Sequence, residues 1–451
     1  MKQWILLCGL VLATGVAGVG QQKKLEKILQ DNNVSGIQLV CVRDGIEKAY
    51  NAGVIRDSSS VQITSSTVFH AASLSKSVFA YIFFRYYDRG LIDLDTPLIR
   101  YTGSYNTFND VRTDKITARM VLRHTTGLPN WGEDNDYKLV FAPDSTFSYS
   151  GEGYVFLQRA LEKITGKSLN QLASEELFGP LGMKNSSYVW DERFSKDVGF
   201  DPADPKDQRY VNKDANAAFS LLTTAEDYTL YLQALLSGKG LRESTRKIMF
   251  EKSSSADRYH ISENEADPFI DWGLGYGLMN NEKGKAIWHW GDGYGGGYKC
   301  FYLGFPATKE TLVFFTHSAK GLDIAPDIVD LFLGKQTAWP IKWLGYGYQH
   351  PAAMRLLKSG RKSAAIKLGL TENDLNSYGY ELLGLGRKKE ALAIFQLNVQ
   401  LYPKSPNTYD SLGETYQALG EKSEAVLNYK KVLELNPESN NAKIHLKQLE
   451  Q

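Results

Sequence analysis

The chain has 451 residues, a length that fits two or three domains at about 150 residues each. Hydrophobic residues make up 43% and charged residues 23%, which excludes a disordered, collagen-like or multi-span membrane protein. The 52 Lys and Arg nearly balance the 51 Asp and Glu, so no nucleic acid partner and no acidic solvating tail are indicated.

The N-terminus has the pattern of a secretory signal peptide. A short cationic start precedes an apolar run over residues 4–19, and Gly18 and Gly20 stand at plausible cleavage positions. The run is shorter than the roughly 20 residues that a membrane-spanning helix needs. We therefore expect residues 1–20 to direct export to the periplasm or the medium, with an uncleaved membrane anchor as the alternative.

The next three hundred residues combine helix and strand patterns. Helical patterns cover residues 25–30, 73–89, 154–164 and 224–236. Strand patterns cover residues 36–45, which end in an Asp-Gly turn, and residues 286–290, 298–305 and 311–316. Strands at both ends with helices between them predict an α+β domain over residues 21–334, whose sheet is assembled from both ends of the domain.

A repeat follows this domain. One copy fits the 34-residue tetratricopeptide pattern, and a shift of 34 residues finds a second copy. The matching positions are Tyr409, Leu412, Gly413, Tyr416, Gly420, Ala425, Tyr429 and Pro437 in one copy and Gly386, Ala391, Phe395 and Pro403 in the other.

These positions predict two repeats, residues 372–405 and 406–439, within a helical tail over residues 352–451. Residues 335–351, with two prolines and two glycines, are expected to be the linker. Two repeats bury too little surface to stand alone. They are expected to dock on the preceding domain, on a helix near residues 352–367, or on a protein partner.

A Ser-x-x-Lys pattern begins the helix at residue 73. Ser73 and Lys76 share one face of the helix start, so the amine can reach the hydroxyl. A hydroxyl needs an adjacent base to become a nucleophile, and a lysine serves only when burial lowers its pKa. The pattern alone is weak, since it recurs at residues 244–247 and 359–362. A helix cap is the alternative interpretation of Ser73.

Two further segments place reactive side chains at the ends of elements. Tyr149 stands in a loop before a helical pattern, where its phenol could exchange protons with Lys76 or pack in the core. His289 ends a strand, and glycines follow within residues 291–297. Glycines there let a substrate approach the strand edge and leave a backbone N–H free as an oxyanion donor. A structural histidine is the alternative.

Taken in order, the segments 73–76 (Ser-Leu-Ser-Lys), 149–151 (Tyr-Ser-Gly) and 289–291 (His-Trp-Gly) resemble the three motifs of the serine β-lactamase/penicillin-recognising superfamily. The resemblance is closest to its class C β-lactamase-like branch, related to family VIII esterases and D-amino-acid peptidases. It implies a five-stranded antiparallel sheet flanked by helices, an all-helical subdomain, and acyl transfer through a serine ester. Supporting stretches are residues 122–129, 219–227 and 272–277.

Carried onto this chain, the resemblance assigns roles to individual residues. Ser73 is the nucleophile, with Lys76 and Tyr149 as the base and proton shuttle. His289 stands where the third motif usually has a lysine. The backbone N–H groups of Ser73 and Asp292 form the oxyanion hole.

The second and third motifs, which border the substrate at Gly151 and Gly291, both depart from the family pattern. Gly151 replaces an asparagine whose amide holds a substrate amide, and His289 is a less reliable cation than lysine. We therefore expect an exported esterase or D-amino-acid peptidase-like hydrolase of small esters, amides or peptides, with β-lactam turnover secondary. The alternative is a non-catalytic penicillin-binding-like protein or repeat-mediated adaptor that recognises peptides or proteins.

No cofactor and no metal are expected. None of the seven histidines lies in a metal-binding pattern, and the glycines of residues 291–296 stand between two strands rather than before a helix. Three cysteines cannot form a disulfide framework. Cys41 and Cys300 are expected to be buried free thiols, although export would permit a disulfide.

Overall fold

The computed structural model describes most of the chain beyond residue 19, and it divides the chain into two units, residues 1–344 and 345–451. Apart from Gly20, the expected signal peptide lies outside the described residues. Within the described part, no helix is long and apolar enough to cross a membrane. The described residues are 20–55, 59–103, 110–131, 139–200, 211–256, 266–293, 297–344, 361–367, 370–384 and 388–450.

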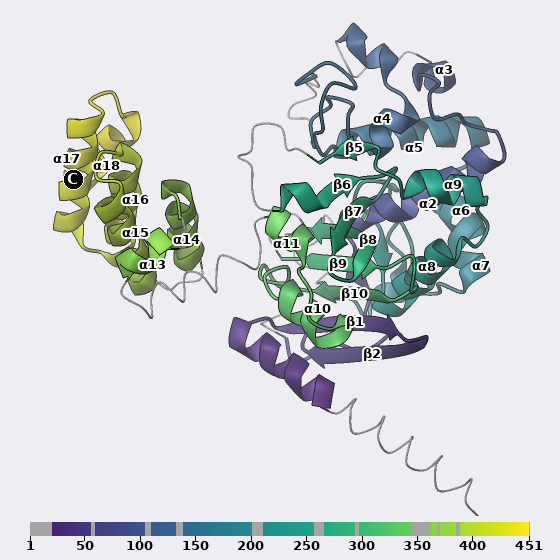
Figure 1. The fold of residues 1–451 in the computed structure, drawn as a ribbon, viewed down its shortest axis with the longest axis horizontal. Helices are drawn as coiled ribbons and strands as arrows, with labels where there is room; N and C mark the ends of the chain where they lie inside the picture. Colours follow the sequence, from purple (N-terminus) through teal and green to yellow (C-terminus); the bar gives the residue numbers. More distant parts are fainter. Residues whose placement is uncertain are drawn as a thin grey trace, which may run out of the picture. The chain divides into compact units, whose positions relative to one another are not determined.

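An antiparallel sheet forms the centre of the first unit (Figure 1). Over the described residues it has eight strands in the order β2-β1-β10-β9-β8-β7-β6-β5. The expected antiparallel sheet is confirmed, but short strands beyond β8 extend it past the five strands that the resemblance implies. The strands are β1 (Gly36–Arg43), β2 (Ile46–Gly53), β5 (Ser254–Ser255), β6 (Ile270–Trp272), β7 (Gly277–Asn281), β8 (Gly284–Asp292), β9 (Lys299–Gly304) and β10 (Thr311–Thr316).

The first strand of the unit lies beside the last one, as the strand patterns at both ends of the domain predict. Val40 of β1 pairs with Val313 of β10 in an antiparallel register. The Asp-Gly turn is also confirmed, because Asp44 and Gly45 both have positive φ, 53° and 74°, as a tight two-residue hairpin turn requires. The sheet therefore contains neighbouring strands from opposite ends of the domain.

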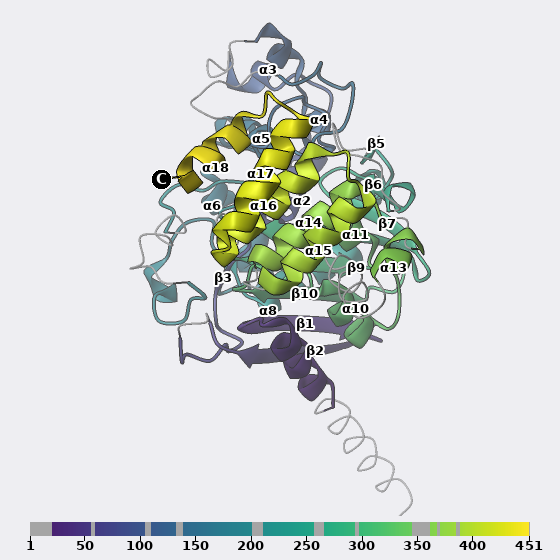
Figure 2. The ribbon, with the colours of Figure 1, turned by 90° about the vertical axis from the view of Figure 1, so that its left-hand side faces the viewer.

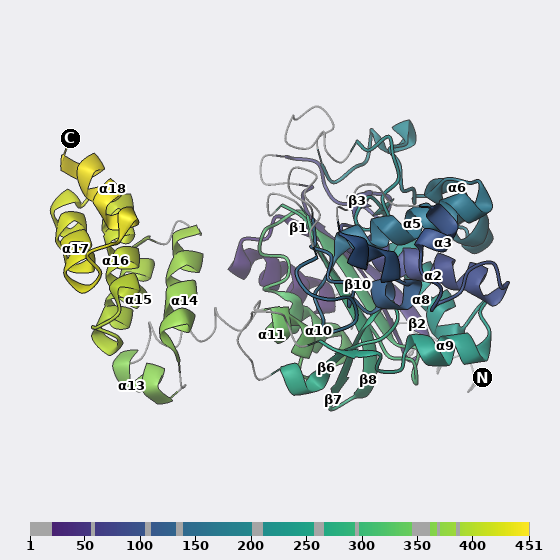
Figure 3. The ribbon, with the colours of Figure 1, turned by 90° about the horizontal axis from the view of Figure 1, so that it is seen from above.

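Helices cover both faces of this sheet (Figure 3). On one face lie α2 (Leu74–Asp88) and α8 (Ala225–Ser237), where the Phe315 and Tyr228 rings are 6.0 Å apart. On the other face lies α10 (Ala325–Leu333), whose Phe332 ring is 4.6 Å from that of Tyr50 in β2. Helix α2 is buried almost all round, which explains its continuous apolar and aromatic sequence.

A helical region continues from the β5 end of the sheet (Figure 1). Helices α3 and α4 both contact α5, whose N-terminus is capped by Ser150 through the backbone N–H of Gly153. Residues 339–344 of the expected linker form α11, which packs on β6 and β7. Besides four short 3₁₀ and π helices, the described part of the unit also contains α3 (Ile99–Thr102), α4 (Ala118–Leu122), α5 (Gly151–Thr165), α6 (Leu169–Ala173), α7 (Gly179–Leu181), α9 (Glu243–Met249), α11 (Trp339–Leu344), and the strands β3 (Phe69–His70) and β4 (Leu222–Thr223).

The described part of the second unit is helical, and from α14 to α18 each helix contacts the next one in sequence (Figure 2). Ala365 of α13 joins the core around Phe395, and Ala442 of α18 joins the core around Tyr429. The repeats thus gain a helix on either side, which supplies the extra burial that two repeats lack. The helices are α13 (Arg361–Lys367), α14 (Glu372–Gly384), α15 (Lys388–Leu401), α16 (Pro406–Leu419), α17 (Lys422–Leu435) and α18 (Asn440–Glu450).

Gly379 allows α14 to pack closely on α15. A Cβ atom at this position would lie 2.3 Å from the ring of Phe395, which is fully buried. We expect Gly379→Ala to destabilise the second unit by about 1–3 kcal/mol. Hydrogen exchange of its helices in the full chain measures this change. The double variant Gly379→Ala/Phe395→Leu should recover part of the loss, and unchanged exchange in Gly379→Ala would contradict the packing.

Candidate active site

Ser73 stands at the first turn of α2, after a strained residue. Ala72 has φ of 43°, a value that side-chain-bearing residues rarely adopt. The Ser73 side chain makes no capping hydrogen bond to the helix. Instead, its Oγ accepts a hydrogen bond from Lys76 Nζ at 3.0 Å. The hydroxyl of Ser73 therefore interacts with the lysine and does not cap the helix.

Lys76 is buried completely and has no carboxylate partner among the described residues. Its second hydrogen bond goes to the neutral backbone oxygen of Ala218 at 2.8 Å. Burial without a counterion disfavours the ammonium form, so the pKa of Lys76 lies well below its ordinary value. The amine beside the serine therefore loses its proton more readily than the amine of an exposed lysine does.

Tyr149 lies against this pair. Its ring centroid is 4.8 Å from Lys76 Nζ and is stacked 4.4 Å from the imidazole of His124. Burial raises the pKa of Tyr149, and the nearby Ser73 hydroxyl opposes this rise only in part. The phenol oxygen is buried and makes no hydrogen bond of normal geometry within the described residues. Tyr149 is therefore a protonated phenol that can donate a proton in the site.

His289 in β8 approaches the same cluster as a neutral imidazole. Its Nδ1 lies 2.8 Å from the backbone oxygen of Trp290. Because a carbonyl only accepts, Nδ1 carries the proton, and Nε2 is an acceptor that has no partner among the described residues. Burial, and then the charge of Lys76, lower the pKa of His289 to about 3. The histidine therefore supplies no positive charge where the family motif has a lysine.

Gly291 brings β8 against the turn that carries the serine. A Cβ atom there would lie 2.3 Å from Cys300 Sγ and 2.7 Å from the backbone oxygen of Ala71. The Cys300 thiol itself donates to that oxygen at 3.2 Å. Cys300 and Cys41 are both buried free thiols, as expected. Only glycine fits between the strand and the turn.

The backbone N–H groups of Ser73 and Asp292 are the two that the family resemblance assigns to an oxyanion hole. The N–H of Ser73 donates to no acceptor within the described residues. The N–H of Gly293 donates to Tyr298 at 2.8 Å, so the alternation of an antiparallel ladder directs the N–H of Asp292 away from β9. The Asp292 carboxylate forms an ion pair with the ammonium of Lys299.

Gly151, the departure in the second motif, sits under an indole ring. Its N–H donates to the backbone oxygen and to Oδ1 of Asn130 at 3.1 and 3.0 Å. A Cβ atom on Gly151 would lie 2.8 Å from Cη2 of Trp131. The space that a side chain would occupy at this position is therefore filled by the tryptophan.

The structure adds residues to which the sequence assigned no role. His124 accepts a hydrogen bond from the N–H of Ser150 through Nδ1 at 3.0 Å and stacks on Tyr149, so it fixes the tyrosine. Ala218 holds the lysine through its carbonyl. His124 and Ala218 lie in or beside the stretches that support the family resemblance, but nothing in their spacing shows the contacts.

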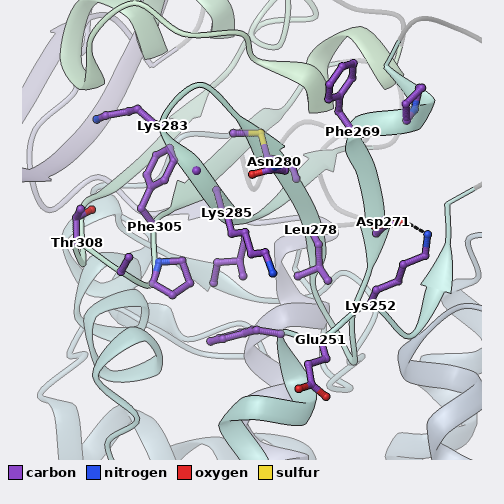
Figure 4. Close-up of a pocket in the computed structure, with 18 residues that line it drawn as sticks. Glu251, Lys252, Phe269, Asp271, Leu278, Asn280, Lys283, Lys285, Phe305 and Thr308 are labelled. Carbon is purple, nitrogen blue, oxygen red and sulfur yellow. Dashed lines mark ion pairs between the residues drawn. The ribbon is translucent and has the colours of Figure 1, made fainter.

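A hollow lies on the sheet away from the predicted site residues (Figure 4). Its volume is about 560 Å³, and its lining includes Leu278, Lys285, Phe305 and the ion pair of Lys252 with Asp271 at 2.7 Å. None of the predicted site residues lines it. In the described part of the chain, no group of three or more His, Cys, Asp or Glu side chains could hold a metal ion.

The sheet between helical layers, with a helix-borne serine and lysine facing a tyrosine and a strand end, defines a penicillin-recognising type of serine hydrolase fold. The profile of the Beta-lactamase family matches residues 22–331, and the chain belongs to this family. The family is part of a superfamily of serine hydrolases. A tetratricopeptide repeat matches residues 406–439.

Relatives and solved structures agree with this assignment. Penicillin-binding protein 4 of Amycolatopsis lactamdurans is 23% identical over 70% of this chain and 89% of its own length. The D-alanyl-D-alanine-carboxypeptidase/endopeptidase AmpH of Escherichia coli is 26% identical over 36% of this chain, which spans about half (48%) of that relative.

Two solved structures share the fold. A class C β-lactamase has a TM-score of 0.58 at 17% identity, with 71% of this chain and 96% of that one covered. The D-amino acid amidase of Ochrobactrum anthropi has a TM-score of 0.55 at 22% identity, with 67% and 91% covered.

Proposed function

We propose that this protein is an exported serine hydrolase that forms an acyl-enzyme at Ser73 with ester or amide substrates. One observation carries the proposal. A fully buried lysine without a counterion in the described residues donates to the Ser73 hydroxyl at 3.0 Å. A merely structural lysine at such a position would need a carboxylate, whereas a lysine kept neutral can act as a base.

In the proposed reaction, Lys76 takes the proton of Ser73 as Oγ bonds to the substrate carbonyl carbon. The N–H groups of Ser73 and Asp292 stabilise the negative charge that develops on the carbonyl oxygen. The bond to the leaving group then breaks as Tyr149 gives that group its phenol proton, and Lys76 passes the proton it took from Ser73 to Tyr149, which restores both side chains. A water molecule then attacks the carbonyl carbon of the acyl-enzyme by the same steps, which releases the carboxylic acid and restores the serine.

The surroundings of Ser73 favour small esters, amides or peptides over β-lactams. Gly151 offers no amide to a substrate, and the neutral His289 offers no charge to a substrate carboxylate. The printed names of relatives, a penicillin-binding protein and a D-alanyl-D-alanine carboxypeptidase, support peptide-like amides as an alternative to esters. β-Lactam turnover is proposed only as a secondary activity.

The accessory parts of the chain are also proposals. Residues 1–20 would direct export, followed by the hydrolase domain (21–334), the linker (335–351), of which α11 packs on the hydrolase domain, and the tail (352–451). The repeats in this tail would bind a protein partner, since tetratricopeptide repeats offer extended binding surfaces.

A serine-reactive fluorophosphonate tests the proposal directly. We expect one label per chain, found by peptide mass spectrometry on Ser73, and no label on the Ser73→Ala variant. Ser244 is an internal control, because it begins another Ser-x-x-Lys pattern but is exposed on α9. It should stay unlabelled.

Two outcomes would reject the hydrolase. In the first, label is absent from Ser73 in the folded protein. In the second, Ser73→Ala retains full activity on p-nitrophenyl esters. Saturable peptide binding without turnover, unaffected by Lys76→Ala, would instead support the non-catalytic binding protein.

A further inference from the structure

Trp131 occupies the place that a side chain of the second motif would take. A Cβ atom on Gly151 would meet the Cη2 and Cζ3 atoms of the indole at 2.8 and 3.0 Å. The preceding residue, Asn130, is bonded to the N–H of Gly151 through both its backbone and side-chain oxygens. The indole of Trp131 therefore leaves no room for a side chain at position 151. Where the family motif has the polar amide of an asparagine, this protein has the face of an aromatic ring.

This indole forms one wall above the catalytic lysine. Its ring centroid lies 5.8 Å from Lys76 Nζ. The ring of Phe219 meets it edge to face at 5.6 Å, and Phe219 directly follows Ala218, whose oxygen binds the lysine. Trp131 remains 42% exposed, so part of its ring is open to a ligand.

Trp290 extends the aromatic surface on the strand side. It follows His289 in β8 and is partly exposed, and its ring centroid lies 4.7 Å from that of Tyr149. The ring of Trp131 thus borders Lys76 directly, whereas the ring of Trp290 borders the site through the ring of Tyr149. Flat apolar groups gain most from such walls, through stacking and through removal of apolar surface from water.

We propose that Trp131 and Phe219 form a subsite for a flat, apolar acyl group, such as phenylacetyl, on the substrate attacked by Ser73. The inference rests on the proposed function and names its substrate class. Trp131 is the specificity-determining residue, because it replaces an amide that would bind a polar acylamino group. Small acyl groups such as acetyl are too short to cover the rings of Trp131 and Phe219.

The ratio of kcat/KM for p-nitrophenyl phenylacetate over p-nitrophenyl acetate tests the subsite. We expect the unaltered protein to favour the phenylacetate at least tenfold. Trp131→Ala should lower this ratio at least tenfold, and Trp131→Phe should retain most of it. Phe269→Ala is a matched control, because Phe269 is 40% exposed and lines the hollow of Figure 4, and it should keep the original ratio.

An equal loss on both esters in Trp131→Ala, or an unchanged ratio, would overturn the subsite while leaving the hydrolase in place. Turnover of neither ester by the unaltered protein would count against the hydrolase. Calorimetry of phenylacetamide binding to Ser73→Ala protein then decides the subsite by itself. Binding at least tenfold weaker after Trp131→Ala supports it, and equal binding rejects it.

Discussion

Replacing Lys76 by methionine is expected to lower kcat/KM for ester hydrolysis by about 10³-fold or more. Methionine has similar length and is apolar, so it suits the fully buried position, but it leaves Ser73 without a base. Lys76→Arg should fail as badly, because a guanidinium keeps its proton at any working pH.

Lys247→Met provides the matched control. Lys247 also ends a Ser-x-x-Lys pattern, but it is exposed and faces Glu251 at 3.8 Å. Its replacement should leave kcat/KM unchanged. Initial rates on p-nitrophenyl acetate, with circular dichroism to verify folding, measure both variants. Near-full activity in Lys76→Met would show that another group accepts the proton of Ser73.

The same lysine determines the expected pH profile. Protonated Lys76 cannot act as a base, so kcat/KM should rise with pH and level off well below the ordinary lysine pKa of 10.5. His289, with a pKa of about 3, should not limit the rise near neutral pH. A rise that continues to pH 10.5 would contradict a neutral buried amine.

The substitution Gly291→Ala is expected to affect stability and activity together. The added Cβ would lie 2.3 Å from Cys300 Sγ and 2.7 Å from the oxygen of Ala71, so either β8 or the serine turn must move. We expect a loss of about 1–3 kcal/mol in the free energy of unfolding. A displacement of about 1 Å at Ser73 lowers kcat/KM by about 10²-fold.

Gly153→Ala separates this effect from a general intolerance of glycine replacement. Its Cβ would make only ordinary contacts, at 3.5 Å from Ser150 Oγ and 3.6 Å from Val121, within α5. Alanine there should be neutral or stabilising. Adding Cys300→Ala to Gly291→Ala should restore part of the stability. Equal thermal midpoints for Gly291→Ala and the unaltered protein would show that the strand and turn are not in close contact.

Local patterns in the sequence predicted the main elements of the sheet domain. The strand at residues 311–316 matches β10 at both ends, and the helix over 73–89 matches α2 within one residue at each end, since Ser73 is its N-cap. The alternation of polar and apolar residues and the continuous apolar runs indicate which faces of an element are buried, and the Asp-Gly pair predicts the hairpin turn. Each of these signals lies within a few neighbouring residues.

The environment of the reactive groups could not be predicted in the same way. The Ser73–Lys76 contact follows from helix spacing, but the burial that lowers the pKa of Lys76 comes from segments more than fifty residues away, including Trp131 and Ala218. From the sequence, Gly151 shows only that the asparagine amide of the family motif is absent. The short distance between Gly151 and the indole of Trp131 in the structure shows that the tryptophan fills the space of the missing side chain.

The strand pairing of β1 with β10 has a consequence for synthesis. The β1–β2 hairpin emerges from the ribosome early, yet one of its edges stays without a partner until translation has passed Thr316. An unpaired strand edge invites association with other chains. Nascent chains of this protein should therefore depend on chaperones that shield this hairpin until β10 arrives.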